Sequence, residues 1–453
     1  MKNKVVYGVV NKVNFPNKGV LTTPDGVVVT VADSFVNQEL GVRLCRKRKG
    51  KWEGRVVEVI KNPDYFKHGE CEYFGMCGGC SLQNLPYELQ LKHKETQVKD
   101  IINAVVEQYE YVGIVSSPSE YGYRNKMEFS FGDSCKNGPL ALGLHRKRTT
   151  FDIITVDGCK IVNDDFNKIL RYVFRYMQVE NIPFYKKKTH EGVLRYLVVR
   201  RSYTTGDLLV NLVTSSQGNY DFTKLKINNI GTEGKVVGFL HTTSDNKADA
   251  VKPEKVDILY GQDFITEEIL GLNFEISPFS FFQTNTRGAQ VLYEKALGLL
   301  SNLQNKVVFD LYSGTGTIAQ IMATKAKFVY GIEIIEEAVI KARANALLNG
   351  LDNCEFIAGD VLEQIDTLQV SPDIIVLDPP REGIHPKAII KIINYNAPEI
   401  LYISCKPTSL AKDLVVLQEH GYNVDKICCV DLFPQTPHIE TVCLLSKLQS
   451  TII

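Results

Sequence analysis

The stretch KVVFDLYSGTGTIAQI (residues 306–321) decides the fold of this chain. An apolar run ends at Asp310, a turn with Gly314 and Gly316 follows, and a helix is expected from Thr317. Glycines in such a turn let the backbone approach a ligand at the N-terminus of a helix. A strand, a glycine-rich turn and a helix in this order predict the first unit of a doubly wound α/β sheet.

The same pattern continues along the C-terminal part of the chain. Further strands are expected at 328–334, 354–360, 373–380 and 399–405, and helices at 336–350, after His385 and at 409–422. Alternating strands and helices of these lengths are typical of a parallel sheet with helices on both faces. Residues 271–453 are therefore expected to form one Rossmann-like domain.

Residues 1–60 follow another pattern, in which short β-branched runs alternate with turns rich in Gly, Pro, Asn and Asp. Five short strands in about 60 residues are typical of a small OB-like β-barrel. This segment has 11 Lys and Arg against 5 Asp and Glu, whereas the whole chain has 52 of each kind. Its charge of +6 predicts contacts with phosphates, for which Arg46, Lys47 and Arg48 are the candidates.

Residues 61–270 are expected to form a central, mostly antiparallel α+β domain. Strand-like runs such as 127–132 and 194–202 dominate, apart from an amphipathic helix over 88–105. Three units agree with a length about three times that of a typical domain. No run approaches the ~18 apolar residues of a membrane span, and we expect a cytoplasmic protein.

Cys71, Cys77 and Cys80 are clustered in a loop with little hydrophobic periodicity, and Cys159 could add a fourth thiolate. In a reducing compartment, clustered cysteines indicate metal binding or catalysis rather than disulfides. Four thiolates suit either zinc or an iron–sulfur cluster, and their spacing does not choose between them.

Acidic residues stand where parallel strands are expected to end, which is the edge at which such sheets bind ligands. Glu333 lies 19 residues after Gly314 and could accept hydrogen bonds from ribose hydroxyls. Asp378 is followed by two prolines at the end of another strand. A nucleotide-like cofactor is therefore expected. The Asp-Pro-Pro segment resembles methyltransferases that act on a planar base, and so favours S-adenosylmethionine over NAD.

Two later segments could supply a nucleophile and a base. Cys405 ends an expected strand, precedes Lys406 and stands at the start of a helix, a setting that predicts a lowered thiol pKa. His438 and Glu440 flank one apolar residue and so fall on the same side of an extended chain. Such a pair could bring a general base to the thiol.

Five motifs in this order resemble the RNA uracil-5-methyltransferase family, which includes ribosomal and transfer RNA enzymes. They are SPFSFFQTN (277–285), DLYSGTGTIA (310–319), DPPREG (378–383), YISCKPTSLAKDL (402–414) and FPQTPHIETV (433–442). The N-terminal barrel resembles a TRAM domain, an RNA-binding module of the ribosomal branch. One departure is Lys406, because the family's nucleophile motif usually reads Ser-Cys-Asn-Pro.

The resemblance implies methyl transfer from S-adenosylmethionine to C5 of a uridine in RNA, with 23S ribosomal RNA as the expected substrate. Cys405 would add to C6 of uracil, and Glu440 would remove the C5 proton. The target base would have to be flipped out or single-stranded. The implied cofactor-binding residues are Gln283, Tyr312, Gly314, Gly316, Glu333, Asp360 and Asp378.

The resemblance also implies a [4Fe-4S] cluster, because the ribosomal branch carries one on a C-x5-C-x2-C…C pattern that Cys71, Cys77, Cys80 and Cys159 match. Arg124, Asn125 and Lys126 match a further family stretch, and their chemistry suits contacts with splayed RNA. Residues 186–188 and 200–201 could extend this basic track. We expect a monomeric enzyme.

Three alternatives remain open. A transfer RNA could be the substrate instead. A radical methylthiotransferase also combines a TRAM-like module, a cluster and S-adenosylmethionine, but its C-x3-C-x2-C motif is narrower than the spacing from Cys71 to Cys77. A non-catalytic RNA-binding protein would not need Cys405 or Glu440.

Overall fold

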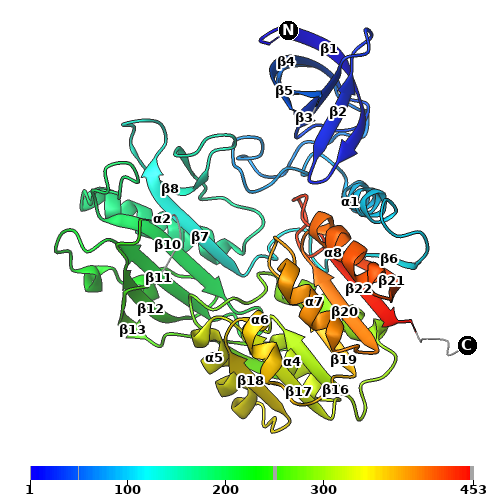
Figure 1. Ribbon diagram of the computed structural model, residues 1–453. Coiled ribbons are helices and arrows are strands. Elements are labelled where there is room, and N and C mark those ends of the chain that lie inside the picture. The colour runs from blue at the N-terminus through cyan, green and yellow to red at the C-terminus, as the bar shows by residue number, and fades with distance from the viewer. Residues whose placement is uncertain (1, 49, 248–252, 449–453) are drawn as a thin grey trace, which may run out of the picture.

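The computed structural model describes residues 2–48, 50–247 and 253–448, and its N-terminal part is a barrel set apart from the other layers (Figure 1). The strands form a closed barrel in the order β1-β2-β3-β5-β4, which confirms the expected OB-like barrel. Alternate side chains such as Val10, Leu21 and Val29 point inward and are fully buried. The strands are β1 (Val5–Asn14), β2 (Lys18–Thr22), β3 (Val28–Ala32), β4 (Glu39–Arg48) and β5 (Lys51–Lys61).

The central sheet has seven strands in the order β13-β12-β11-β10-β7-β8-β9. All neighbouring pairs are antiparallel except β11 and β12, which agrees with the expected α+β pattern. Helix α2 (Asp164–Val179) packs its apolar stripe on this sheet. The strands are β7 (Lys126–Asp133), β8 (Leu140–His145), β9 (Ile153–Thr155), β10 (Leu194–Arg201), β11 (Leu208–Thr214), β12 (Val236–Thr243) and β13 (Lys255–Gly261).

The third layer is an eight-stranded sheet in the order β18-β17-β16-β19-β20-β22-β21-β6. Strands β18 to β20 in this order are parallel, and β22 is antiparallel to both of its neighbours. This confirms the Rossmann-like α/β layer. The strands are β6 (Glu110–Val115), β16 (Val307–Leu311), β17 (Phe328–Glu333), β18 (Cys354–Ala358), β19 (Ile374–Leu377), β20 (Glu399–Ser404), β21 (Tyr422–Val430) and β22 (Glu440–Lys447).

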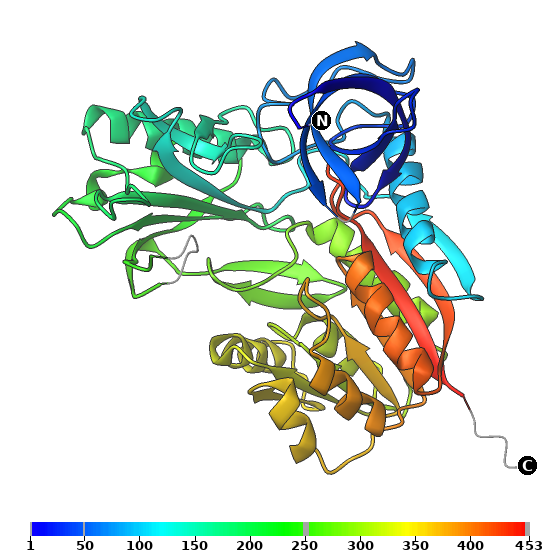
Figure 2. The same ribbon diagram turned by 45° about the horizontal axis from the view of Figure 1, so that its top comes forward.

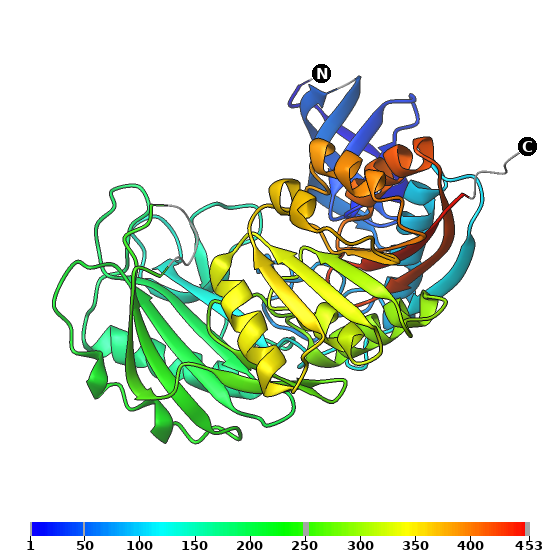
Figure 3. The same cartoon turned by 60° about the horizontal axis from the view of Figure 1, so that its bottom comes forward.

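Helices cover both faces of this sheet, as Figure 3 shows. Successive side chains of a strand point to opposite faces, so Val308 joins one core and Phe309 the other. The first core includes α3 (Thr286–Leu299), α4 (Thr317–Ala323), α5 (Glu336–Leu348) and the hairpin of β14 (Ile265–Ile269) and β15 (Leu272–Ile276). The second includes α1 (Tyr87–Ile102), α6 (Val361–Gln364), α7 (Pro386–Asn394) and α8 (Pro407–Glu419).

Besides β14, two elements of the segment 61–270 belong to this α/β layer. Strand β6 pairs in parallel with β21 and forms an edge of the eight-stranded sheet. Helix α1 buries Val98 and Ile102 in the second core, beside α8, and lies under the barrel (Figure 2). The chain thus runs from the barrel through the α/β layer before it enters the central sheet. No helix in the described ranges is both long and apolar enough to cross a membrane.

Candidate active site

The turn after β16 forms a backbone cradle at the carboxyl edge of the sheet. Gly314 and Gly316 have φ values of 54° and 76°, in the left-handed region that favours glycine. A Cβ atom on Gly316 would lie 2.6 Å from the Phe356 ring, so a larger residue would not fit without movement. Gly316 is the N-cap of α4. The free N–H groups at the start of a helix suit a polar or anionic ligand group, such as a cofactor carboxylate.

Glu333 ends β17 directly beside this turn. One carboxylate oxygen accepts a hydrogen bond from the Gly314 N–H at 3.0 Å, and the other accepts from the Ile335 N–H at 2.9 Å. These bonds fix the carboxylate, and each of its oxygens keeps a lone pair. Glu333 therefore keeps free acceptor capacity, and its contact with a ribose stays a prediction.

Carboxyl groups gather at the same edge of the sheet. Burial raises the pKa of Asp378 to about 7. Burial and then the Asp378 carboxylate raise the pKa of Asp310 to about 8. Two close carboxyl groups do not both ionise readily, so a ligand with a positive charge would stabilise them. The sulfonium and amino groups of S-adenosylmethionine have that charge, and the residues present therefore fit the expected cofactor.

Tyr312 and Asp360 lie close to each other, just beyond the carboxyl ends of β16 and β18. Tyr312 follows β16 with a φ of 111°, and its side chain is half-buried. Burial and then Asp360 raise the pKa of Tyr312 to about 12. Asp360 is the N-cap of α6 and accepts a hydrogen bond from the Leu362 N–H at 2.8 Å. Part of this carboxylate is therefore engaged in the helix cap, and its contact with a cofactor stays a prediction.

Gln283 lies on the segment before α3 and is half-buried. Its side chain hydrogen-bonds Tyr293 of α3, a buried residue whose pKa is raised well above the usual value by burial and then by the charges of Asp378 and Glu440. Gln283 is thus connected through Tyr293 to both the cofactor edge and the expected base. Its direct contact with a ligand stays a prediction.

Cys405 follows β20 and faces Glu440, Asp378 and Arg381. Burial, followed by the charges of Glu440 and Asp378, raises the pKa of the thiol. The expectation of a lowered pKa is therefore wrong, because burial and two carboxylates oppose the thiolate. The cation that favours the thiolate is Arg381, whereas the sequence suggests Lys406.

Lys406 also differs from the family's Asn in what its side chain does. It is the N-cap of α8 and makes no capping hydrogen bond, although Asn is among the best capping residues. The Ser404 hydroxyl instead accepts from the Lys406 N–H at 3.2 Å. The backbone around Cys405 is thus held by the residue before it.

Glu440 is the first residue of β22 and is 3% exposed. Burial and then Asp378 raise its pKa to about 8, and Arg381 partly opposes this. Arg381 also donates a hydrogen bond to Nδ1 of His438 at 3.1 Å. Burial and then the Arg381 charge lower the pKa of His438 to about 4, so the ring is neutral at pH 7. Arg381 thus links the thiol, the histidine and the buried carboxyl group.

The segment 431–438, which leads to Glu440, is held by side chains of α1. Lys94 binds Asp431 at 2.6 Å, with the two side chains 1% and 0% exposed, and also donates to the Phe433 carbonyl at 3.1 Å. The Gln90 amide group makes two hydrogen bonds to Gln435, both at 2.9 Å. A helix far away in sequence therefore positions this segment.

The segment 277–285 is fixed by the central sheet. The Asn125 side chain donates to the Gln283 carbonyl at 3.0 Å and to the Thr286 hydroxyl at 2.8 Å. Arg200 is 2% exposed, and its guanidinium donates to the carbonyls of Pro278 and Ser280. Arg200 therefore cannot belong to an exposed basic track. Asn125 positions the segment 277–285, and its RNA contact stays a prediction.

The other RNA-binding candidates lie in two separate places. Arg124 is close enough to His438 to lower its pKa, which puts this cation beside the active site. The Lys126 ammonium group binds Glu128 at 2.7 Å. Arg46, Lys47 and Arg48 are exposed at the end of β4, where Arg46 pairs with Glu53; Lys49 lies outside the described residues. All these RNA contacts stay predictions.

Cys71, Cys77, Cys80 and Cys159 line one small cavity of about 20 Å³. Burial raises the pKa of Cys80 to about 12 and that of Cys159 to about 11. Buried thiols of this kind become thiolates readily only beside a positive charge. Within the described residues, however, no group of three or more His, Cys, Asp or Glu is arranged to hold a metal ion. The four cysteines thus share one cavity without an arrangement that would hold a metal ion, and a cluster on them stays a prediction.

Sequence reasoning missed several residues of this site. Arg381 stands in a quoted motif, and its charge next to Asp378 is a usable signal. Lys94 occupies a helical position in register with the buried Val98 and Ile102, and a lysine there signals a buried partner. The buried role of Arg200 could not be recognised, because the sequence does not distinguish it from its neighbour Arg201, which is partly exposed.

The chain is similar to known RNA methyltransferases. A family model described as tRNA (Uracil-5-)-methyltransferase matches residues 248–448. An uncharacterized RNA methyltransferase of Clostridium tetani is 45% identical over 437 residues, which cover 96% of this chain and 95% of that protein. Another, from Caldanaerobacter subterraneus subsp. tengcongensis, is 45% identical over 449 residues, 98% of this chain and 99% of that protein.

Among solved structures, the chain resembles a Pyrococcus abyssi tRNA (uracil-54, C5)-methyltransferase in complex with S-adenosyl-L-homocysteine. The TM-score is 0.76 and the identity 27%, and the match covers 97% of this chain and 100% of that one. The barrel, the central sheet and the α/β layer are thus shared as one arrangement. The chain belongs to the RNA (uracil-5-)-methyltransferase family and is an S-adenosylmethionine-dependent RNA methyltransferase.

Proposed function

We propose that this protein methylates C5 of a uridine in ribosomal RNA through a covalent bond between Cys405 and the base. The observation that carries the proposal is the convergence of Cys405, Glu440 and Arg381 beside the carboxyl edge that holds Asp378. A radical methylthiotransferase and a non-catalytic RNA-binding protein are set aside by the family to which the chain belongs.

The chemistry follows from the properties of uracil and of these side chains. Bound at the edge that carries Gly314 and Glu333, S-adenosylmethionine supplies an electrophilic methyl group. The Cys405 thiolate adds to C6, and the electron pair displaced from the C5–C6 bond makes C5 a nucleophile for that methyl group. Glu440, as a carboxylate, then takes the proton from C5, the C5–C6 double bond re-forms, and the thiolate leaves. Arg381 favours the ionised forms of both side chains.

We infer that three parts of the chain divide the work. Residues 1–60 supply phosphate contacts, 61–270 hold the cluster and shape the RNA path, and 271–453 bind the cofactor and perform the chemistry. The exposed Arg46, Lys47 and Arg48, and Arg124 beside His438, support this division.

Ribosomal RNA is proposed because the four-cysteine pattern and the barrel resemble the ribosomal branch. Transfer RNA is the second candidate, favoured by the description of the family model and by the substrate of the Pyrococcus abyssi enzyme. That enzyme is matched over its whole length, so the order of domains alone does not separate the two substrates.

The deciding experiment is mass-spectrometric mapping of 5-methyluridine in ribosomal and transfer RNA from a gene deletion and its parent. Loss of one or two methylated positions in large-subunit ribosomal RNA, restored by the wild-type gene but not by Cys405→Ala, supports the proposal. Loss confined to transfer RNA assigns the second candidate. Unchanged 5-methyluridine in both RNAs contradicts the proposed function.

We propose a [4Fe-4S] cluster on Cys71, Cys77, Cys80 and Cys159, supported by their shared cavity. The cluster would tie the loop that contains the first three cysteines to the central sheet, and methyl transfer needs no electron from it. Anaerobically purified protein should contain about four irons and four sulfides per chain and should be brown. Cys80→Ala should lose this iron, while Cys45→Ala, an exposed cysteine on the barrel, should keep it. Stoichiometric zinc in colourless protein would contradict the cluster.

The rate at which free 5-methyluridine product forms in a single turnover should rise with pH. Glu440 acts as a carboxylate, and its pKa of about 8 means that the active form is a minority at pH 7 and dominates above pH 8. Cys405 contributes in the same direction, because its raised pKa also lowers the fraction of thiolate at pH 7. A rate that is flat between pH 6.5 and 9 would contradict this assignment.

Arg381→Gln should move that pH profile to higher values, because the lost positive charge favoured both ionised groups. We expect the rate at pH 7 to fall by ~10-fold or more and to recover in part at pH 9. Arg343→Gln, at a cation that binds the Phe356 carbonyl far from the thiol, is the matched control and should leave the profile in place. An equal loss of rate at all pH values would mean that Arg381 does not act by favouring the ionised groups.

A further inference from the structure

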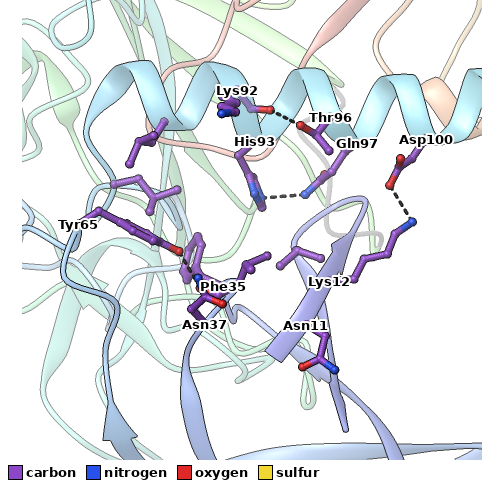
Figure 4. A pocket seen from close by; sticks show the side chains of 14 residues that line it. Asn11, Lys12, Phe35, Asn37, Tyr65, Lys92, His93, Thr96, Gln97 and Asp100 are labelled. Carbon is purple, nitrogen blue, oxygen red and sulfur yellow. Dashed lines mark hydrogen bonds and ion pairs between the residues drawn. The ribbon is translucent and has the colours of Figure 1, made fainter. Parts of the chain in front are cut away.

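A cavity of about 450 Å³ lies between the barrel and α1, apart from the active site (Figure 4). Its volume falls in the range of about 300–1,000 Å³ that is usual for small-ligand pockets. One wall comes from the barrel and the segment that follows it, and the other from one face of α1. None of the residues assigned to cofactor binding or catalysis lines it.

The lining combines aromatic rings with unengaged polar groups. Phe35 is 4% exposed and packs edge-on against Phe66, so the half-buried rings of Tyr65 and His93 form the accessible aromatic part of the wall. The side chains of Asn11 and Asn37 make no hydrogen bond within the part of the chain that the structure describes, and both are exposed. Rings for stacking and amides that both donate and accept are the groups that read an unpaired base.

The charges of the cavity favour a phosphate-bearing ligand. Lys12 of the barrel pairs with Asp100 of α1 at 2.7 Å and neutralises the carboxylate among the lining residues (Figure 4). Lys92 makes no ion pair within the described ranges, and its charge remains available. Burial lowers the pKa of His93 to about 4, so this ring is neutral and suited to contact with a base. The site therefore has one available cation beside aromatic and amide groups.

The neighbouring face of α1 connects this cavity with the active site. His93 and Gln97 line the cavity and hydrogen-bond each other at 2.7 Å, whereas Gln90 and Lys94, on the adjacent face, bind the segment 431–438. Helix α1 therefore contacts both this cavity and the segment that leads to Glu440. An RNA nucleotide is the ligand that suits both the chemistry of the lining and this position.

We propose that the cavity between the barrel and α1 binds one unpaired nucleotide of the substrate RNA, other than the uridine that is methylated. This inference rests on the proposed function. The base would lie against the aromatic wall and the amide groups, and its phosphate would face Lys92. The RNA would then have to present a second extruded nucleotide at a fixed distance from the target uridine. This requirement would contribute to the choice of uridine.

The test combines variants of the protein with variants of the RNA. Thr96→Trp fills the cavity from an exposed helical position, and Lys92→Ala removes the proposed phosphate contact without adding volume. The matched control is Lys99→Ala, which removes the same charge from a position of α1 outside the cavity. The ligand is an RNA fragment around the mapped 5-methyluridine site, with an abasic nucleotide placed at each other position in turn.

We expect Thr96→Trp to weaken RNA binding by ~10-fold, the order of one lost stacked base, and to leave S-adenosylmethionine binding unchanged. One abasic position should cost wild-type protein a similar factor and cost Thr96→Trp nothing further, since both changes remove one contact. Lys92→Ala should weaken binding, and Lys99→Ala should not.

The outcomes separate the two proposals. Wild-type protein that makes no 5-methyluridine in the fragment contradicts the proposed function, and the nucleotide pocket with it. The pocket alone is overturned if wild-type protein methylates the fragment and every abasic position weakens RNA binding by Thr96→Trp as much as it weakens RNA binding by wild-type protein. If Thr96→Trp does not fold, Lys92→Ala decides: affinity equal to that of Lys99→Ala overturns the pocket.

Discussion

Glu440→Gln should accumulate a covalent protein–RNA adduct that survives denaturing electrophoresis, while turnover falls by ~10²–10⁴-fold. The amide cannot take the C5 proton, so the reaction stops after methyl transfer with Cys405 still bonded to C6 of uracil. Glutamine nearly preserves the volume of this 3% exposed side chain, and the loss reports chemistry rather than packing. The measurement is a shifted protein band with labelled RNA, followed by mass spectrometry of the adduct.

Cys405→Ala is the matched control for this experiment. It should bind S-adenosylmethionine and RNA as the parent does, but form no band and no 5-methyluridine, and the double variant with Glu440→Gln should behave in the same way. A band that persists in the double variant would mean that another nucleophile bonds to the RNA. Wild-type turnover by Glu440→Gln, without a band, would assign the base to another residue.

The order of layers could be predicted from the sequence because each layer follows a local pattern. Strands of the α/β layer are short apolar runs that end in a polar motif, and their parallel order brings Gly314, Glu333 and Asp378 to one edge. The five strands of the barrel follow from alternation and turn residues. Chemistry placed at strand ends can therefore be recognised from short stretches of sequence.

The electrostatics of the site could not be predicted in the same way. The pKa of Cys405 depends on burial and on Glu440, which stands 35 residues later and reaches the thiol only because β22 pairs with β20. The neighbours of Cys405 in the sequence, a lysine and the start of a helix, suggest a lowered pKa instead. Strand β6 escapes prediction for a related reason, because its pairing with β21 joins residues about 300 positions apart and leaves no periodic signal.

Contacts made by residues far earlier in the chain could not be predicted from the sequence either. Lys94 and Asp431 are separated by 337 residues, and neither belongs to a motif with a known spacing. Asn125 and Arg200 are also far in sequence from the segment 277–285, which they hold through hydrogen bonds. The segments 277–285 and 431–438 are thus both held by residues that precede them by 75 positions or more.

Lys94→Met should lower stability by about 3–5 kcal/mol, the usual cost of leaving one charge of a buried ion pair without its partner. Asp431 would keep its hydrogen bonds from the Tyr87 hydroxyl and the Phe433 N–H, but would lose the ammonium group 2.6 Å away. The segment that leads to Glu440 would lose two of its bonds to α1, those from the Lys94 ammonium group to Asp431 and to the Phe433 carbonyl, so methylation should fall as well. Denaturant midpoints and single-turnover rates measure the two effects.

Lys94→Met combined with Asp431→Asn removes both charges and should regain more than half of the lost stability, because no buried charge is left unpaired. If α1 positions the segment 431–438, the methylation rate of this double variant should remain low even where its denaturant midpoint recovers. Affinity for S-adenosylmethionine should stay unchanged, since Gly314 and Glu333 lie on the other part of the sheet edge. A rate that recovers together with the midpoint would reduce Lys94 to a stabilising residue, and a single variant that unfolds at the parent's midpoint would contradict the buried pair itself.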